Sequence, residues 1–251
     1  MRWFTLVTLL LTGCVCDSGV KQPVDSPERE ETARTGDIAA HEECPNVLII
    51  GDSISMGYTP HVKALLKGKV NVSRARGNCG DTRNGLRRLE DWLGDTEWQV
   101  IHFNWGLHDL CYRHPDSKVY GHRDKIKGRI AVPLDAYEKN LEELVQRLKQ
   151  AGAVLIWAST TVVPEGEAGR FVGDDEKYNE AAAAVMKKHG IAIDDLHALT
   201  RGFDPSLFVS PGDVHYTKEG YEKLGGQVAQ TIEESLRKAR AAQAGTKKTA
   251  R

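Results

Sequence analysis

The chain has 251 residues, of which 40% are hydrophobic, 27% charged and 7% aromatic. This ordinary composition excludes collagen-like, coiled-coil and wholly disordered proteins, and the length fits one large domain or two small ones. The 34 lysines and arginines nearly balance the 35 acidic residues, giving a formal net charge of −1. We therefore expect no nucleic-acid partner held by bulk positive charge.

The N-terminus has the features of an export signal. A short basic start is followed by an apolar run, residues 3–11, which is too short to span a bilayer. The run ends in Leu-Thr-Gly-Cys, with the cysteine at position 14, and this ending resembles the bacterial lipobox. We expect residues 1–13 to be removed and Cys14 to be lipidated, anchoring the protein to the cell envelope on its periplasmic or outer-membrane face. The alternative is an ordinary cleaved signal and a secreted protein, in which Cys14 has no special role.

Two segments next to the central region have the composition of flexible chain. Residues 14–44 are rich in acidic residues, contain Pro23 and Pro27, and hold few large apolar side chains. Such a segment buries too little surface to offset its ordering entropy, so we expect a linker. At the other end, residues 241–251 are basic and small, and we expect a disordered tail. The folded domain is then residues 45–240.

Within this domain, short apolar runs alternate with helical patterns. The runs rich in β-formers are residues 47–50, 70–72, 100–103 and 153–157, with a weaker one at 191–193. The helical patterns cover residues 61–66, 86–93, 134–148, 174–189 and 218–239. Continuous apolar strands are typical of a parallel sheet covered on both faces, so the alternation predicts one three-layer α/β/α domain.

Polar and glycine-rich segments follow the first three strands. Gly51-Asp52-Ser53 follows the first, Arg76 to Thr82 the second, and Asn104 to Asp109 the third. A fourth segment, Gly212 to Thr217, precedes the last helix. Sites in such sheets form where the strands end. A serine there can be a nucleophile, although Ser53 could also only cap the following helix, and residue 55 is a serine, which excludes the Gly-x-Ser-x-Gly elbow.

The order of these four segments resembles the SGNH (GDSL) hydrolase superfamily. The resemblance implies a flavodoxin-like five-stranded parallel sheet. It also implies that Ser53 is the nucleophile, that the backbone N–H groups of Ser53 and Gly80 stabilise the oxyanion, and that His215 is the general base. Such enzymes need no cofactor and no metal, and we expect a monomer.

Two positions depart from the superfamily pattern. The third block usually reads Gly-x-Asn-Asp, but His108 occupies the asparagine position. An imidazole N–H can still donate a hydrogen bond, and Asn104 is a substitute donor. The acid usually lies three residues before the histidine, where this chain has Gly212. Asp213, two residues before His215, can face the same side of an extended segment and complete a triad; otherwise the site is a Ser–His dyad.

The sequences of the third and fourth motifs are similar to those of bacterial superfamily members described as carbohydrate acetylesterases. This similarity implies a serine esterase that removes O-acyl groups, above all O-acetyl groups, from a polysaccharide or glycan. The alternatives are a lysophospholipase or thioesterase, a cell-envelope O-acetyltransferase, and a non-catalytic glycan-binding relic.

Several other residues allow more than one interpretation. Cys79 and Cys111 flank the motifs and could form a disulfide in an oxidising compartment. The set His108, Cys111, His114 and Asp116 matches no zinc spacing, so we expect no metal site. Other candidates carry a structural and a functional interpretation: Trp105 and Trp157 as core or sugar-stacking residues, Asp194, Asp195 and His197 as strand-end structure or a functional acid, and Arg76 and Arg83 as surface or anion-binding residues.

Overall fold

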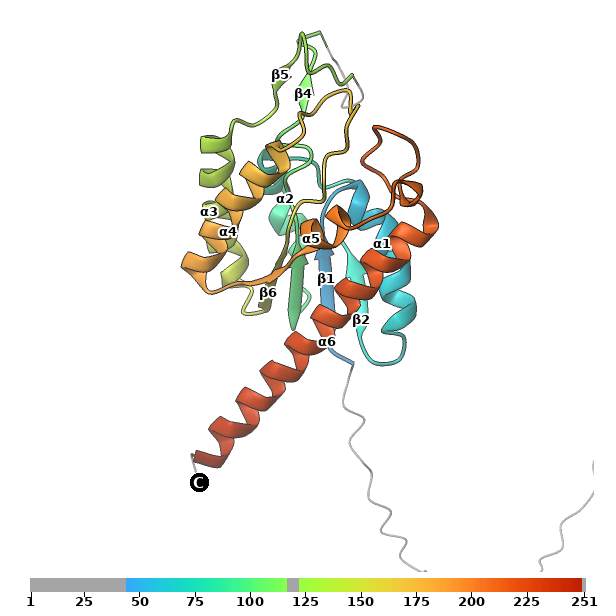
Figure 1. Ribbon diagram of the computed structural model, residues 1–251. Helices are drawn as coiled ribbons and strands as arrows, with labels where there is room; N and C mark the ends of the chain where they lie inside the picture. The colour runs from blue at the N-terminus through green and yellow to red at the C-terminus, as the bar shows by residue number, and fades with distance from the viewer. Residues whose placement is uncertain (1–43, 117–121, 250–251) are drawn as a thin grey trace, which may run out of the picture. The chain divides into compact units, whose positions relative to one another are not determined.

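The structure is a computed structural model that describes residues 44–116 and 122–249 (Figure 1). The predicted signal segment, the lipidation site at Cys14 and almost all of the predicted linker lie outside the described residues. None of the described helices combines the length and the hydropathy needed to cross a membrane.

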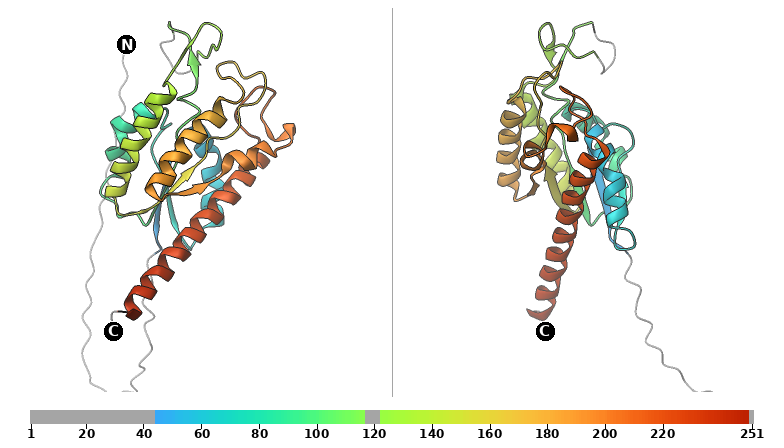
Figure 2. Two further views of the ribbon diagram at one scale, coloured as in Figure 1. Left: turned by 60° about the vertical axis from the view of Figure 1, so that its left-hand side comes forward. Right: turned by 45° about the vertical axis from the view of Figure 1, so that its right-hand side comes forward.

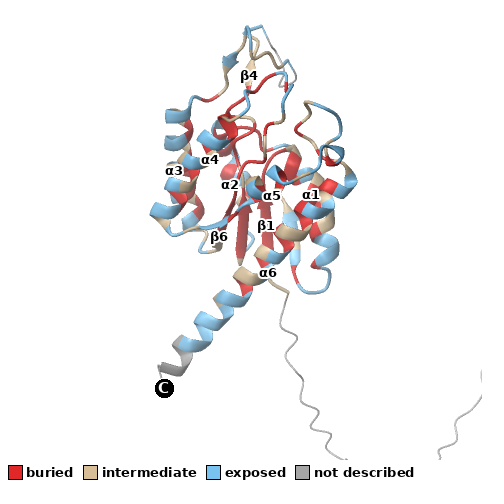
Figure 3. Cartoon of the chain, in the orientation of Figure 1, coloured by how far each residue is buried: buried red, intermediate tan, exposed pale blue. Residues whose placement is uncertain are grey.

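Five parallel strands form the central sheet, in the order β2–β1–β3–β6–β7. Their bounds are Asn46–Ile50 for β1, Asn71–Arg74 for β2, Val100–Phe103 for β3, Val154–Ala158 for β6 and Ala192–Asp194 for β7. The side chains of β3 are all buried, and those of β1 nearly so (Figure 3). This strand order confirms the predicted flavodoxin-like sheet. The chain turns back between β1 and β3, so a ligand crevice is expected at their carboxyl ends.

Helices cover both faces of the sheet (Figures 1 and 2). Their bounds are Ser53–Leu65 for α1, Thr82–Leu93 for α2, Leu134–Gln150 for α3, Asp174–His189 for α4, Leu196–Arg201 for α5 and Lys218–Thr249 for α6, with a short 3-10 helix, η1, at Pro205–Leu207. Helices α1 and α6 pack together on one face, and α2, α3 and α4 lie side by side on the other. The predicted three-layer arrangement is confirmed.

Helices α1 and α6 depart most from the ranges that their patterns predict, and α2 begins four residues before its predicted start. Helix α1 begins at Ser53 and passes through Pro60, whereas the apolar pattern starts only after that proline. Asp52 starts the helix early, because its carboxylate accepts a hydrogen bond from the N–H of Ile54 at 2.9 Å. Helix α6 continues to Thr249, through most of the segment expected to be a disordered tail. Alanine and lysine, which are good helix formers, account for six of the eleven residues 241–251.

The segment between β3 and α3, described at residues 104–116 and 122–133 and here called the excursion, rises above the carboxyl edge of the sheet (Figure 1). It contains a small antiparallel ribbon, in which β4 (Tyr112–Arg113) pairs with β5 (Arg129–Ile130). The segment 164–170, between β6 and α4, is joined to it by backbone hydrogen bonds from Tyr112 to Gly169 and from Lys125 to Ala168. These segments form one wall over the strand ends where the sequence motifs lie.

Candidate active site

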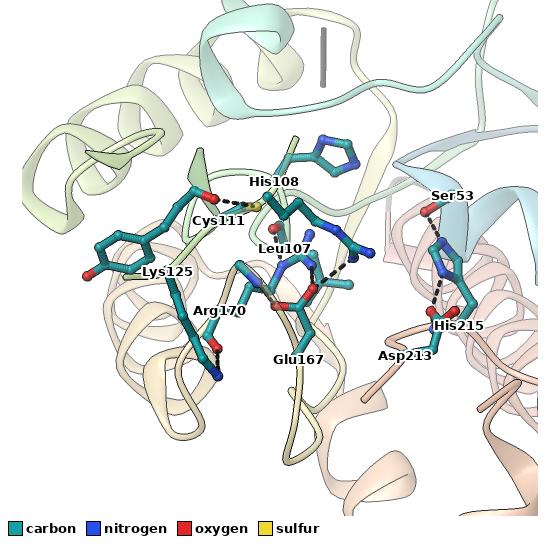
Figure 4. A network of polar contacts seen from close by, with 12 residues as sticks. Ser53, Leu107, His108, Cys111, Lys125, Glu167, Arg170, Asp213 and His215 are labelled. Carbon is teal, nitrogen blue, oxygen red and sulfur yellow. Dashed lines mark hydrogen bonds and ion pairs between the residues drawn. The ribbon is translucent and has the colours of Figure 1, made fainter. Parts of the chain in front are cut away.

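Ser53, His215 and Asp213 form a chain of hydrogen bonds at the carboxyl edge of the sheet (Figure 4). Ser53 is the first residue of α1, and the other two lie in the loop before α6. The Ser53 hydroxyl lies 2.8 Å from Nε2 of His215, and Nδ1 of His215 lies 2.6 Å from Oδ1 of Asp213. The backbone N–H of His215 donates to the same carboxylate oxygen at 2.9 Å. One oxygen of Asp213 therefore holds both the ring and the backbone of His215.

The protonation pattern of this chain follows from the carboxylate. Burial opposes ionisation of Asp213, but hydrogen bonds from His215 and the charges of His215 and Arg123 hold its pKa below the ordinary value. A carboxylate only accepts hydrogen bonds, so Nδ1 of His215 carries the ring proton and Nε2 is left to accept from Ser53. The side chains of His215 and Asp213 are 38% and 30% exposed, so substrate and water can reach the imidazole.

Gly212 explains why the acid is at position 213. Its φ is +75°, a conformation that favours glycine, and a Cβ there would lie 2.8 Å from the carbonyl oxygen of Gly166. An aspartate three residues before His215 would therefore collide with the backbone of the segment 164–170. The carboxylate of the next residue, Asp213, reaches Nδ1 of His215 at 2.6 Å.

Gly80 is buried in the loop after β2, and its N–H already has a partner. Gly80, at φ +64°, donates to Oδ1 of Asn78 at 2.9 Å. Asn78 lines the same cleft as Ser53, although the motifs alone do not mark it as a site residue. Its Asn-x-Gly spacing is a turn signal, since asparagine side chains accept hydrogen bonds from the backbone two residues on.

A buried carboxyl group ties the second and third motif loops together. Oδ1 of Asp109 accepts from the backbone N–H of Thr82 at 2.8 Å and from the Thr82 hydroxyl at 2.5 Å. Asn140 donates in turn to that hydroxyl at 2.9 Å. Burial raises the pKa of Asp109 to about 8. The contacts fix the loop that carries Gly80 against the loop that carries His108.

His108 lines the cleft, and Asn104 does not. Burial is the largest of the effects that lower the pKa of His108, so the imidazole is neutral near pH 7. The guanidinium of Arg113 lies 3.4 Å from Nδ1 and can only donate, which places the ring proton on Nε2. The amide of Asn104 instead donates to the carbonyl of Ala158 at 2.7 Å. The suggested substitute donor is thus committed to the neighbouring strand β6.

The cleft around Ser53 has a volume of about 360 Å³, and most of the residues that line it are polar or charged. Three arginines line it, at positions 113, 123 and 170. None of them belongs to a motif that the sequence analysis used. They come together only because the excursion and the segment 164–170 are hydrogen bonded to each other, so no local pattern could have identified them.

The two tryptophans offered as sugar-stacking residues lie in the core. Trp105 and Trp157 are 0% and 1% exposed, and neither lines the cleft. Trp105 stacks instead on Trp92, with ring centroids 6.5 Å apart. The core interpretation is therefore the correct one.

The other candidate residues have partners outside the cleft. Asp194 contacts buried His102 at 2.9 Å, Asp195 caps α5, and His197 lies 2.8 Å from Asp175. Arg83 pairs with Asp81 at 2.6 Å. Arg76 is exposed, and neither it nor Arg83 lines the cleft.

The cysteines at positions 79 and 111 are both buried and unbonded, so the suggested disulfide is absent. Burial raises the pKa of the Cys79 thiol to about 11, which makes it a poor nucleophile. Over residues 44–116 and 122–249, no three His, Cys, Asp or Glu side chains are placed to bind a metal ion together. The set around Cys111 is therefore not a metal site in the described structure.

Comparison with known proteins places the chain in a family. The GDSL-like lipase/acylhydrolase family model matches residues 49–223. A search of curated protein sequences finds no significant match. Among solved structures, an acetyl xylan esterase, AlAXEase, is 16% identical with a TM-score of 0.60, covering 74% of this chain and 99% of its own.

Two further structures show the same fold. The lipase/acylhydrolase from Enterococcus faecalis is 18% identical with a TM-score of 0.62, and the match covers 76% of this chain and 96% of that one. An acetylxylan esterase from Geobacillus stearothermophilus, Axe2, is 18% identical with a TM-score of 0.59, covering 75% and 94%. The extent of the family match settles the assignment: the chain belongs to the GDSL-like lipase/acylhydrolase family and is an ester hydrolase of SGNH type.

Proposed function

We propose that this chain is a serine esterase that cleaves O-acyl esters, above all O-acetyl esters, on a polysaccharide or glycan. The observation that carries the proposal is the chain of hydrogen bonds from Ser53 through His215 to Asp213, open to a polar cleft. A serine hydroxyl in contact with an imidazole, itself oriented by a carboxylate, is the arrangement that activates an oxygen nucleophile.

Acylation proceeds through a tetrahedral intermediate, with His215 first taking a proton and then giving it up. Nε2 of His215 takes the proton of Ser53 while the Ser53 oxygen bonds to the ester carbonyl carbon. The backbone N–H groups of Ser53 and Gly80 and the Nε2–H of His108 stabilise the resulting oxyanion. The tetrahedral intermediate collapses by breaking the bond to the alcohol oxygen. His215 gives its proton to that oxygen, so the alcohol leaves neutral.

Deacylation repeats the chemistry with water as the nucleophile. His215 removes a proton from water, and the hydroxide oxygen bonds to the acyl carbon. Collapse breaks the bond to Ser53, which recovers its proton from His215 while the acid departs. Asp213 remains ionised throughout and stabilises the imidazolium that forms in both steps.

The polarity of the cleft favours a short acyl group on a hydrophilic alcohol. Among the residues that line it, Leu107 and Val214 are apolar and the others polar or charged. A long acyl chain would need a continuous apolar surface, which the lysophospholipase and thioesterase alternatives require. Two of the structures with the same fold are, by their names, acetyl xylan esterases.

The proposal can be tested with activated esters and the purified full chain. We expect hydrolysis of p-nitrophenyl acetate to exceed that of p-nitrophenyl octanoate in kcat/KM. Ser53→Ala and His215→Ala should each lower kcat by about 10³-fold or more. Ser73→Ala, at an exposed serine on edge strand β2, is the matched control and should keep full activity. Full activity in either site variant would refute the mechanism, and preference for octanoate would refute the acetylesterase assignment.

A further inference from the structure

The wall of the cleft made by the excursion and the segment 164–170 is unusually rich in arginine. Arg113 lies on β4, Arg123 pairs with it in an antiparallel bridge, and Arg170 precedes α4. All three line the cleft that contains Ser53 and His215. Figure 4 shows Arg170 and Glu167 on the side of the site facing Ser53, His215 and Asp213.

One buried carboxylate serves two of these guanidinium groups. Glu167 is 0% exposed, and its Oε1 accepts from Nη1 of Arg170 and from Nη1 of Arg123, both at 2.8 Å. Its Oε2 accepts from the backbone N–H of Gly169 at 2.6 Å. Glu167 offsets the charge of one guanidinium group, so these three groups together carry a net charge of +1.

The two arginines have different surroundings. Arg170 is 4% exposed, and its Nε donates to the carbonyl oxygen of Leu107 at 2.7 Å, so it supports the loop of His108. The side chain of Arg123 is 35% exposed and uses Nη1 on Glu167. Arg170 is therefore the buried counterion of Glu167, and Arg123 is the cation that faces the solvent of the cleft.

The position of Arg123 is fixed by the backbone beneath it. Tyr112 donates its N–H to the carbonyl of Gly169 at 2.6 Å, and Asp124 donates to the carbonyl of Tyr112 at 3.1 Å. A Cβ at Gly169 would lie 2.6 Å from the Cβ of Arg123, so only glycine allows this approach. A guanidinium held in place before binding loses less conformational entropy when it meets an anion.

Two acidic residues line the cleft, Asp52 and Asp213, and both form their hydrogen bonds with groups other than Arg123. The carboxylate of Asp52 is 2% exposed and caps α1 through the N–H of Ile54. Asp213 accepts from the ring and the backbone of His215. Among the described residues, Arg123 thus hydrogen bonds to the carboxylate of Glu167, while its charge also acts on Asp213.

We infer that the cleft takes acylated saccharides that carry an anionic group, a carboxylate or a sulfate, and that Arg123 binds this group beside Ser53. The inference rests on the proposed esterase function and narrows its substrate class. Guanidinium groups bind carboxylate and sulfate oxygens through paired, charge-assisted hydrogen bonds, which are stronger than neutral ones. A saccharide with its acid on the ring can place that group against the wall while its acetyl ester reaches Ser53.

The test uses three O-acetylated methyl glycosides that differ at one carbon. They are the glucoside, the glucuronoside and the 6-O-sulfated glucoside, each acetylated at the same hydroxyl. We expect kcat/KM for at least one anionic ester to exceed that for the neutral glucoside by about tenfold at low salt. This preference should shrink as ionic strength rises. Which anionic ester is preferred distinguishes carboxylate from sulfate recognition.

Variants locate the preference on the wall. Arg123→Gln should lower the ratio of anionic to neutral kcat/KM, whereas Arg87→Gln, at an exposed arginine on α2, should leave the ratio unchanged. Equal kcat/KM for all three esters, or a preference that Arg123→Gln leaves intact, would overturn the inference while the esterase function stands. No hydrolysis of these esters or of p-nitrophenyl acetate would overturn the esterase function, and this inference with it.

Discussion

The side-chain oxygen of Asn78 accepts a hydrogen bond from the backbone N–H of Gly80 at 2.9 Å. In the proposed mechanism the same N–H stabilises the oxyanion, so Asn78 competes with the transition state for one donor. The side chain of Asn78 is exposed and lines the cleft, so it has room to turn away when an ester binds.

Replacing Asn78 with aspartate should lower kcat for acetyl esters by about tenfold, because a carboxylate holds the Gly80 N–H more strongly and repels the oxyanion. Asn78→Ala removes the competing acceptor and should keep kcat at the wild-type level or raise it. Steady-state kinetics of both variants measure the effect. If Asn78→Ala loses as much activity as Asn78→Asp, the competition does not exist and the amide itself is needed.

The role of Gly212 in positioning Asp213 can be tested by substitution, with a second glycine of nearly the same backbone conformation as the control. Gly212→Ala puts a Cβ 2.8 Å from the carbonyl oxygen of Gly166, so the loop that carries Asp213 must shift. We expect kcat to fall at least about tenfold, since small displacements of catalytic groups are costly. The left-handed conformation costs the alanine variant a further 1–2 kcal/mol, roughly, of unfolding free energy.

Gly68→Ala is the matched control. Gly68 has φ +77°, close to the +75° of Gly212, but a Cβ there meets nothing within 4 Å. The control should lose a similar conformational free energy and keep its kcat. Denaturant unfolding and kinetics on both variants separate strain from displacement, and an unchanged kcat in Gly212→Ala would show that the contact with Gly166 does not position Asp213.

The strands and the order of the motifs are predicted well from the sequence, because each depends on a short stretch of residues. The apolar runs at residues 47–50 and 100–103 are buried on both faces and match β1 and β3 to the residue or nearly so. The start of α1 is missed because Pro60 interrupts the apolar pattern, although the Asp52 cap and the packing of α1 on α6 keep the helix continuous. Helix propensity is a weak signal beside tertiary contacts.

Contacts between distant segments account for what the sequence does not predict in the site. Asn104 looks like a spare donor in the motif, but its amide bonds to Ala158 on a strand 54 residues further on. Arg123 and Arg170 meet at Glu167 through the pairing of two loops. No periodicity or spacing encodes such pairings, so the cationic wall emerges only from the folded chain.

His108 occupies the position where the superfamily has an oxyanion asparagine. If its Nε2–H stabilises the oxyanion, His108→Ala should lower kcat by about 10²–10³-fold, with a smaller change in KM, because the bond forms only in the transition state. His108→Asn restores an N–H donor and should retain more of the kcat than the alanine variant.

The lowered pKa of His108 removes one source of pH dependence from kcat. Burial lowers this pKa from its ordinary value near 6.5. The imidazole therefore stays neutral to a lower pH than that of an ordinary histidine. Its protonation should not limit kcat near neutral pH. A rise in KM with unchanged kcat in His108→Ala would contradict the oxyanion role and assign His108 to ground-state binding.

Asp109 should make the stability of the protein depend on pH. Burial, more than the charge of Asp81, raises its pKa to about 8, against the hydrogen bonds from Thr82. In the unfolded chain the carboxyl titrates near pH 3.9, roughly. Between these two pH values the native state binds a proton that the unfolded state lacks. This contribution to stability is complete below the unfolded pKa and is lost as the pH rises through the native one.

Asp109→Asn removes the titration and keeps a carbonyl oxygen for Thr82. The free energy of unfolding of the variant, minus that of the wild type, should therefore increase steadily from about pH 5 to about pH 8. Urea unfolding at several pH values measures it, and Asp95→Asn, at an exposed carboxyl, should show no such trend. A difference that does not change with pH would mean that Asp109 is ionised in the native protein, and the buried link between the Gly80 and His108 loops would then have to be held by a carboxylate.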